Sequence, residues 1–256
     1  MAQTNLTHST PAQARQLQFM TLVVLIICWE LVARSGLLYE GVVPPTLQVL
    51  SALWQELSTA SLYQHLGITV AEILAGFVIA TVSGVIVGIA LGSRRFVSRV
   101  ADPFLSSLAT TPKIIFLPIV MLMFGIGPAS KVAVGALSGF FPIALSTMAG
   151  ALAVRPVLIN VGKGFNLTRW QMMTRIYLPS LVGPVIRGMR LGLGVTIIGV
   201  LLGEIKLANS GLGFLAIEYY NSFRIAHMYS ILLVIFALAI AINMLMNVIS
   251  RRYDRT

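Results

Sequence analysis

Long apolar stretches separated by short polar segments form the main pattern of this chain. Runs of roughly 20 apolar residues occupy 17–34, 68–92, 104–124, 132–153, 181–203 and 228–249. A helix rises about 1.5 Å per residue and the hydrocarbon layer is about 30 Å thick, so each run is long enough to cross a membrane. These runs lack the alternating polarity of transmembrane β-strands. The pattern predicts an all-α, polytopic membrane protein with about six transmembrane helices.

Composition supports a membrane protein over a soluble one. Of the 256 residues, 57% are hydrophobic and 10% are charged, whereas soluble domains carry about 25% charged residues. The net charge of +10 does not indicate nucleic-acid binding, because the charges stand in short islands between apolar runs and not on one solvated face.

The basic residues between the runs predict the orientation. Lys and Arg are enriched in cytoplasmic loops because they resist translocation. With a cytoplasmic amino end, the inner loops and tails hold Arg15, Arg94, Arg95, Arg99, Arg155, Lys163, Arg169, Arg175, Arg251, Arg252 and Arg255. The outer loops then hold only Arg34, Lys131, Lys206 and Arg224. We therefore expect both tails, 1–16 and 251–256, to be cytoplasmic.

The segment 17–64 is expected to hold the first transmembrane helix and an amphipathic helix. The first run is longer than the apolar part of a signal peptide and has no small-residue cleavage site behind it, which indicates a retained anchor. Cys28 has no second thiol to pair with and is expected to face lipid or fill a gap. After Pro44 and Pro45, a helix-start signal, apolar residues follow at helical spacing: Leu47, Leu50, Leu53, Trp54 and Leu57. They predict a helix along the outer interface.

Two of the apolar runs contain features that suggest more than a lipid-facing helix. In the second run, Ala80, Gly84, Gly88 and Gly92 recur at every fourth residue, which favours close helix packing, with pore lining as the alternative. The third run is interrupted by Pro112, Lys113 and Pro118. Irregular helices are tolerated beside a cavity or other protein, so Lys113 and Pro118 are pathway candidates. Alternatively, Lys113 extends to the cytoplasmic interface.

The remaining titratable residues do not form a recognisable reaction centre. Glu72, near the outer end of the second run, has no visible chain of partners and is interpreted as an interfacial residue with access to water, with a role in a proton or ion relay as the alternative. His65 and His227 lack partners at metal-ligand spacing and are expected to be solvated residues at helix ends. We expect neither a metal site nor an enzymatic site.

The segment 154–179 predicts a helix–turn–helix projecting into the cytoplasm. Pro156 is suited to open a short helix and Pro179 to end the following one. Between them, Gly162, Gly164 and Asn166 are suited to a turn. The alternative is a basic loop that lies on anionic lipid.

The segment EIKLANSGLGFLAIEYYNSF, which follows Gly203, is too polar to span a membrane. We expect it to form a partly re-entrant outer gate. Glu204 and Asn209 belong to this candidate gate, and Gly211 and Gly213 are expected to make its turn.

The segment 154–179 resembles the cytoplasmic loop of binding-protein-dependent ABC permeases. That pattern runs Glu-Ala-Ala, three residues, Gly, nine residues, then Ile-x-Leu-Pro. Ile176, Leu178 and Pro179 match its end in register, whereas Asn160-Val161-Gly162 replace Glu-Ala-Ala and Asn166 replaces the glycine. Asn tolerates the left-handed backbone best among ordinary residues, so the turn is expected to persist.

A wider resemblance covers most of 65–250 and points to the nitrate, sulfonate, taurine and bicarbonate permease group. It rests on AGFVIATVSGVIVGIALG, TPKIIFLPIVMLMFGIGPASK and EIKLANSGLGFL. The resemblance implies a type I ABC importer permease fold in a bacterial inner membrane. It also implies a pathway for a small solute, such as a sulfonate, taurine or nitrate, delivered by a periplasmic or lipid-anchored binding protein.

The resemblance further implies a homodimer of permeases whose cytoplasmic loops dock on an ABC ATPase dimer. The residues expected at this coupling contact are Asn160, Lys163, Gly164, Asn166, Arg169, Trp170, Leu178 and Pro179. The chain has no G-x-x-x-x-G-K-[ST] phosphate loop. It is therefore expected to bind no cofactor, with ATP and Mg²⁺ used by the partner. The alternative function is one half of an ion-coupled secondary transporter.

Overall fold

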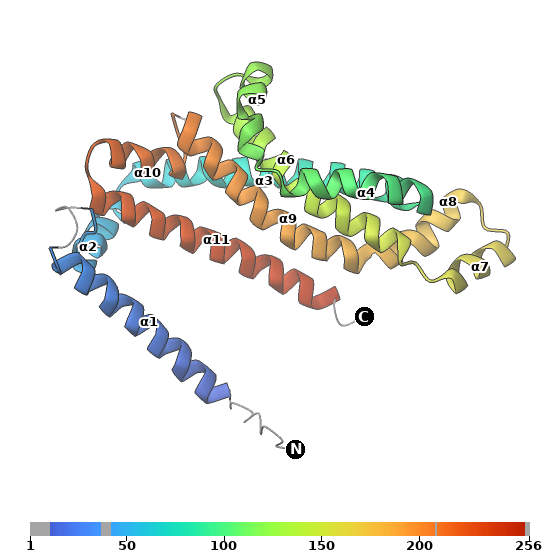
Figure 1. Cartoon of the computed structure of the whole chain (residues 1–256), viewed down its shortest axis with the longest axis horizontal. Coiled ribbons are helices and arrows are strands. Elements are labelled where there is room, and N and C mark those ends of the chain that lie inside the picture. Colours follow the sequence, from blue (N-terminus) through green and yellow to red (C-terminus); the bar gives the residue numbers. More distant parts are fainter. Residues whose placement is uncertain (1–10, 37–41, 208, 254–256) are drawn as a thin grey trace.

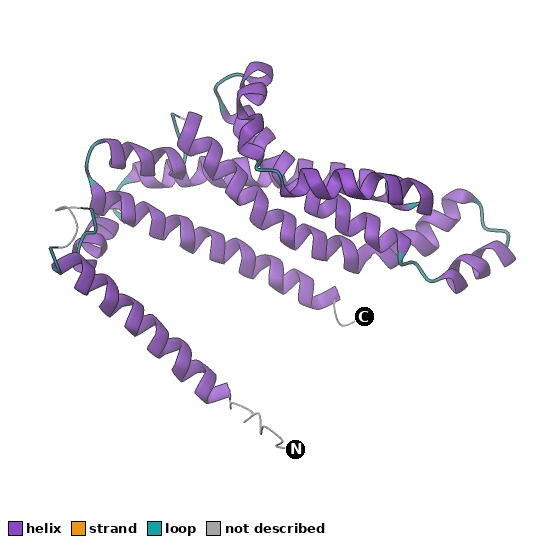
Figure 2. Ribbon diagram, in the orientation of Figure 1, coloured by secondary structure: helices purple, strands orange, loops and turns teal. Residues whose placement is uncertain are grey.

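The computed structural model describes residues 11–36, 42–207 and 209–253, and all regular secondary structure in these ranges is helical (Figure 2). The helices long and apolar enough to cross a membrane are Arg15–Arg34, Ala60–Gly92, Pro128–Leu152, Arg169–Lys206 and Ile225–Val248. A sixth crossing results if one sharply bent pair of helices counts as a span. The prediction of an all-α, polytopic protein with about six spans is confirmed.

The helices follow one another with short connections. In chain order they are α1 (Pro11–Arg34), α2 (Thr46–Leu57), α3 (Ala60–Gly92), α4 (Arg95–Thr110), α5 (Leu117–Phe124), α6 (Pro128–Leu152), α7 (Pro156–Gly164), α8 (Arg169–Met172), α9 (Leu178–Leu207), α10 (Leu212–Asn221) and α11 (Ile225–Tyr253). A 3₁₀ turn, Lys113–Phe116, precedes α5, and a π-helical segment, Met173–Tyr177, precedes α9. In Figure 1, α3, α6 and α9 lie side by side, with α4 and α11 along them.

Glycines bring α3, α6 and α9 into backbone contact. A Cβ on Gly88 would lie 2.6 Å from Thr147 Cβ and 2.7 Å from Ala144 O, both on α6. A Cβ on Gly139 of α6 would lie 3.0 Å from Gly192 O on α9. Since these distances exclude any side chain, the backbones fit only at these glycines. The predicted packing face, Ala80, Gly84, Gly88 and Gly92, is buried throughout and is confirmed.

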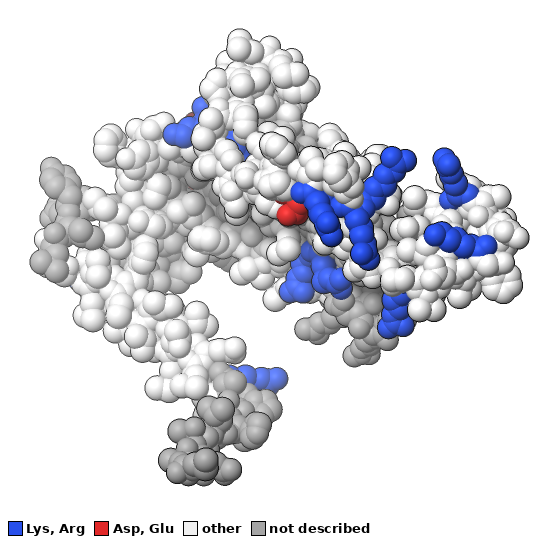
Figure 3. Space-filling model, turned by 45° about the vertical axis from the view of Figure 1, so that its right-hand side comes forward, with Lys and Arg blue, Asp and Glu red and all other residues white. Residues whose placement is uncertain are grey.

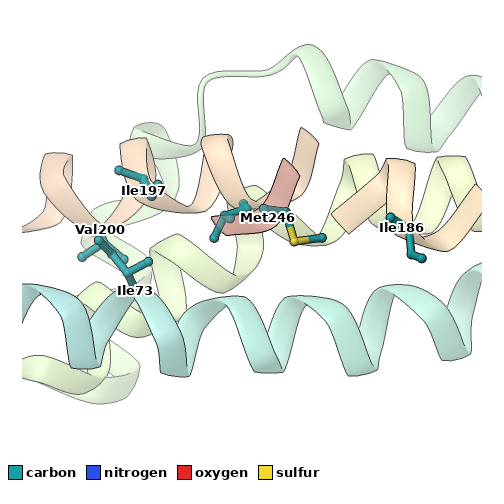
Figure 4. Close-up of a cluster of buried hydrophobic side chains, with 6 residues drawn as sticks. Ile73, Ile186, Ile197, Val200 and Met246 are labelled. Atoms are coloured by element: carbon teal, nitrogen blue, oxygen red, sulfur yellow. The ribbon is translucent and has the colours of Figure 1, made fainter. Parts of the chain in front are cut away.

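Apolar side chains close the rest of the bundle. One cluster joins α3, α9 and α11 and consists of Ile73, Ile186, Leu193, Ile197, Val200 and Met246 (Figure 4). A second joins α3, α10 and α11 and consists of Leu62, Leu212, Leu215, Ala216 and Ile231. The two clusters fix α11 along the bundle and hold α10 at one end of it.

The third apolar run, 104–124, is not one straight span as predicted. The segments Arg95–Thr110 and Lys113–Phe124 meet at an angle of 88°, and in Figure 1 α5 stands out from the bundle. The bend falls at Pro112, which has no N–H to continue the helical hydrogen-bond ladder. The predicted interruption is confirmed, but it redirects the chain.

The first helix leaves the bundle and is held at one end, by contacts with the segment 44–46 and with Tyr229 of α11, whose ring centre lies 5.2 Å from that of Trp29. Trp29 Nε1 donates to Pro44 O at 3.0 Å, and Glu30 Oε2 accepts from Thr46 N at 3.0 Å and from Thr46 Oγ1 at 2.9 Å. Cys28 is exposed on α1, as a lipid-facing residue would be. These contacts hold one end of α1 while its apolar length diverges (Figure 1).

The predicted start of the amphipathic helix is confirmed, because α2 begins at Thr46, directly after Pro45. Its buried face consists of Val49, Ala52 and Glu56. The predicted apolar positions Leu47, Leu50, Trp54 and Leu57 are exposed, so this stripe is available to a membrane interface. That α2 lies along the interface stays a prediction.

We expect Gly88→Ala to destabilise the chain, because the added Cβ must push α3 away from the backbone of α6. Overpacking of this kind costs about 1–3 kcal/mol. Gly67→Ala on the same helix is the matched control, since nothing lies within 4 Å of its Cβ position. Thermal unfolding in mild detergent measures the difference, and equal melting temperatures for both variants would contradict the packing described here.

Candidate functional site

Three buried charged residues meet between α3, α6 and α9. Glu72, Lys131 and Glu204 have exposed fractions of 3%, 2% and 0%. Lys131 Nζ lies 2.6 Å from Glu72 Oε1 and 3.4 Å from Ser210 O. Lys131, predicted in an outer loop, lies inside the bundle because α6 already begins at Pro128. The interpretation of Glu72 as an interfacial residue is wrong, because its carboxylate is buried against Lys131 of α6. The sequence did not indicate that α6 lies beside this part of α3.

Glu204 fastens the start of α10 to the bundle. Its Oε1 accepts from Thr69 Oγ1 at 2.7 Å, and its Oε2 accepts from Gly213 N at 2.7 Å. Thr69 Oγ1 in turn accepts from Leu212 N at 2.8 Å. The first N–H groups of a helix have no partner within the helix, so this carboxylate and hydroxyl satisfy two of them in α10.

The turn between α9 and α10 is made by Gly211, as predicted. Gly211 has φ +105°, and a Cβ there would lie 2.2 Å from Glu204 Oε1, so only glycine fits. Its N–H donates to His65 Nδ1 at 2.9 Å, so His65 is not the solvated residue that was expected. Gly213 is not part of the turn but lies in the first turn of α10. Asn209 is exposed beside the turn.

A second polar cluster joins α2, α10 and α11 at the same end of the bundle. Glu56 Oε1 accepts from Tyr219 Oη at 2.7 Å and lies 2.7 Å from His227 Nδ1. Arg224 Nη2 lies 3.1 Å from His227 Nε2, so His227, expected to be solvated, is held on both sides. Burial and the bond to Glu56 raise the pKa of Tyr219 to about 12, which keeps its hydroxyl a donor. The cluster fixes α2 to the end of α10.

At the opposite end, α7 and α8 form the predicted helix–turn–helix. Asn166 has φ +54°. Its N–H donates to Lys163 O at 2.9 Å, and Leu167 N–H donates to Gly162 O at 3.0 Å. This is the Schellman pattern of a helix end, with Asn in the left-handed position usually taken by glycine. The predicted persistence of the turn despite Asn166 is confirmed.

The second arm of this hairpin begins with a capping box. Thr168 N donates to Gln171 Oε1 at 2.9 Å, and Gln171 N donates to Thr168 Oγ1 at 3.3 Å. Gly162 packs against this arm, since a Cβ there would lie 2.6 Å from Ile176 Cδ1. Two capped ends and a packed contact make the pair α7–α8, with its turn, a defined unit that we call the hairpin.

Pro179 does not end the second arm, contrary to expectation. Helix continues from Arg169 to Lys206, and the π-helical segment Met173–Tyr177 lies just before the proline. Its wider turn accommodates a residue that lacks the N–H of a regular helix. The second arm of the hairpin and Glu204 therefore lie on one continuous helical segment.

The predicted coupling residues lie on the outside of the hairpin and at its junction with α9. All eight are exposed: Asn160, Lys163, Gly164, Asn166, Arg169, Trp170, Leu178 and Pro179. Figure 3 shows Lys and Arg gathered at this end of the molecule. Its exposed basic residues are Arg94, Arg95, Arg99, Arg155, Lys163, Arg169, Arg175, Arg187 and Arg190. The last two lie inside the predicted run 181–203, which therefore begins with a charged, exposed turn.

Lys113 lies at the break between α4 and α5. Its Nζ donates to Ala109 O and lies 5.0 Å from the centre of the Phe141 ring, in the middle of α6. The ammonium is thus held against the bundle and does not extend to a helix end. Pro118 is exposed on α5. Neither residue contacts the candidate gate, and their place on a pathway stays a prediction.

Sequence comparison relates the chain to membrane components of transport systems. The family described as "Binding-protein-dependent transport system inner membrane component" matches residues 80–256. The taurine transport system permease protein TauC of Escherichia coli (strain K12) is 33% identical over 76% of this chain and 73% of its own length. The nitrate import permease protein NrtB of Synechocystis sp. is 28% identical over 78% of this chain and 75% of its own.

A solved structure shows the same fold. The MetNI methionine ABC transporter, in an inward-facing conformation, matches over 84% of this chain and 99% of the matched chain, with a TM-score of 0.59 and 19% identity. At that identity the likeness concerns the fold alone. It confirms the predicted architecture.

We expect Lys131→Met to destabilise the chain by about 3–5 kcal/mol, because it leaves the Glu72 carboxylate buried without its cation. Adding Glu72→Gln should restore most of the loss, since no uncompensated charge then remains. Unfolding of the two single variants and the double variant, measured as a double-mutant cycle in detergent, tests the pair. Additive losses in the double variant would mean that the two groups do not interact.

Proposed function

The chain belongs to the inner-membrane components of binding-protein-dependent transport systems, and on this premise we propose that two copies of it form the translocation pathway for a small anion. It is the permease subunit of an ATP-driven importer, and ATP hydrolysis takes place on a separate subunit. This family membership argues against the alternative function, one half of an ion-coupled secondary transporter.

The observation that carries the proposal is the hairpin at the basic end of the molecule. The end of α7 and the start of α8 both have satisfied backbone hydrogen bonds, so the hairpin is suited to move as a rigid unit. Its outer surface presents Trp170, with an exposed fraction of 75%, beside the cation of Arg169. Aromatic and Arg side chains dominate binding energies at protein interfaces. The hairpin is therefore suited to dock on an ABC ATPase, which uses ATP and Mg²⁺.

The continuous helical segment offers a mechanical route from the hairpin to the candidate gate. It spans 38 residues from Arg169 to Lys206, or about 57 Å at the rise of an α-helix. At its far end Glu204 holds the start of α10. A displacement of the hairpin by ATP-driven closure of the ATPase pair would reach the α9–α10 turn along this segment. Reversing a 1:99 population takes about 5.5 kcal/mol, which is within reach of nucleotide binding.

The direction of the chain in the membrane follows from this docking. The hairpin then faces the cytoplasm of a bacterium, and the Pro11 end of α1 and the Tyr253 end of α11 both point toward the hairpin end (Figure 1). Both termini are accordingly cytoplasmic. The α9–α10 turn faces outward, where a periplasmic or lipid-anchored binding protein would deliver the solute. The names of TauC and NrtB favour taurine, another sulfonate or nitrate as that solute.

Trp170→Ala is expected to weaken association with the ATPase by about 2 kcal/mol, roughly 30-fold, the size of an interface hot spot. Trp54→Ala is the matched control, because Trp54 has a nearly equal exposed fraction of 74% but lies on α2, at the other end of the molecule. Pull-down of the ATPase by each tagged variant measures the effect.

Retained ATPase binding and uptake in the Trp170→Ala variant would remove this residue from the docking contact. A loss of binding in both tryptophan variants would instead indicate a general folding defect. Size-exclusion profiles of each variant separate these cases.

A gating role for the α9–α10 turn predicts state-dependent exposure of Asn209. In a Cys28→Ser background, Asn209→Cys is expected to react with an external thiol reagent at different rates in nucleotide-free and ATP-trapped complexes. Trp54→Cys on α2 is the control position. Equal rates in both states at Asn209→Cys would exclude a gate at this turn.

A further inference from the structure

A cavity lies where the third span breaks. It has a volume of about 230 Å³ and is bounded by the α4–α5 break, α6 and α9. Lys113 and Thr111 line it from the break, Ser138 from α6, and Ile198 and Leu202 from α9. The remaining lining residues are apolar, so Lys113 is the charged group in a lining whose polar residues are Lys113, Thr111 and Ser138.

The cavity lies near the middle of the length of α6, on a side of the bundle where Ile198 is exposed. Ser138 is the eleventh residue of the 25-residue helix α6, so it lies about 15 Å from one end of that helix and about 21 Å from the other. Broken helices and ionisable residues at such a depth are costly, and in membrane proteins they mark binding sites and pathways.

The charge of the partly buried Lys113 has no counterion among the described residues, unlike that of the buried Lys131. Lys131 is neutralised by Glu72 at 2.6 Å. For Lys113, the described residues provide the carbonyl of Ala109 and the face of the Phe141 ring, and no carboxylate within ion-pair distance. An ammonium has three N–H donors. A cation held at this depth with spare donors, beside a cavity, lacks an anion.

We propose that this cavity is an anion subsite of the translocation pathway and that Lys113 is the charge that selects anions there. The inference rests on the proposed transport function and names the class of solute and the residue that recognises it. The ammonium binds a compact anionic head such as a sulfonate or nitrate. The Ile198 and Leu202 wall accommodates a short apolar tail.

Charged thiol reagents test the subsite without knowledge of the natural solute. Ile198→Cys, in a Cys28→Ser background, places a thiol on the exposed cavity wall. The ATPase complex in proteoliposomes is labelled with an anionic sulfonatoethyl and a cationic trimethylammonioethyl methanethiosulfonate. We expect Lys113→Gln to lower the ratio of anionic to cationic labelling rates by at least about tenfold, because one unit charge beside the thiol acts oppositely on the two reagents.

Two matched variants separate a local charge from a general one. Lys206→Gln removes the same charge from an exposed residue at the end of α9 and should leave the ratio unchanged. Lys113→Arg should keep it high. In the Ile198→Cys protein that retains Lys113, taurine added as a competitor should slow labelling by the anionic reagent more than choline does.

The outcomes distinguish this inference from the proposed function. The reference is the Ile198→Cys, Cys28→Ser protein in which Lys113 is unchanged. If the Lys113→Gln complex still contains the ATPase but its labelling ratio stays within twofold of the reference ratio, the subsite is wrong and the transport function stands. Equal protection by taurine and choline would also overturn the subsite. If the protein that retains Lys113 binds no ATPase, the proposed function fails, and the subsite, which rests on it, fails with it.

Discussion

The close approach of α3, α6 and α9 is the interaction on which the rest of the structure depends. In lipid there is no hydrophobic driving force for helix association, so the helices are held together by van der Waals contact between complementary surfaces and by hydrogen bonds. Gly88, Gly139 and Gly192 allow backbones to approach where any side chain would collide. This spacing also places Glu72, Lys131 and Glu204 within reach of one another, from helices far apart in the sequence. Packing therefore precedes and positions the polar network.

The polar network transfers that order to the end of the bundle. Because no water is available inside a bilayer to satisfy buried polar groups, Glu204 and Thr69 are the partners that the first N–H groups of α10 require. The same helical segment that carries Glu204 begins at the hairpin. A permease must link an event on its cytoplasmic ATPase to an opening on the other side, and this chain has a continuous element between the two places. The broken third span lies beside this element and contributes Lys113.

Local patterns were sufficient to predict most of the membrane-spanning helices, the glycine packing face and the turn at Asn166, because each follows from the residues of one segment. The ion pair of Glu72 with Lys131 was missed because its members are on different helices, and periodicity within a helix does not say which helices meet. Lys131 stands only three residues after Pro128, a helix-start signal that could have placed it inside α6. Pro179 was misread because a π-helical segment absorbs the missing N–H, and sequence periodicity does not reveal such a segment. The bend at Pro112 was expected as an interruption, but its angle depends on packing against α6.

As a permease, this chain is expected to pair with a second copy of itself and with two ATPase subunits. Native mass spectrometry of the tagged chain, purified in mild detergent with its cellular partners, measures this composition. We expect a complex of two copies of this chain and two copies of a protein that carries a phosphate-binding loop. A stable oligomer of the chain that contains no ATPase would contradict this expectation.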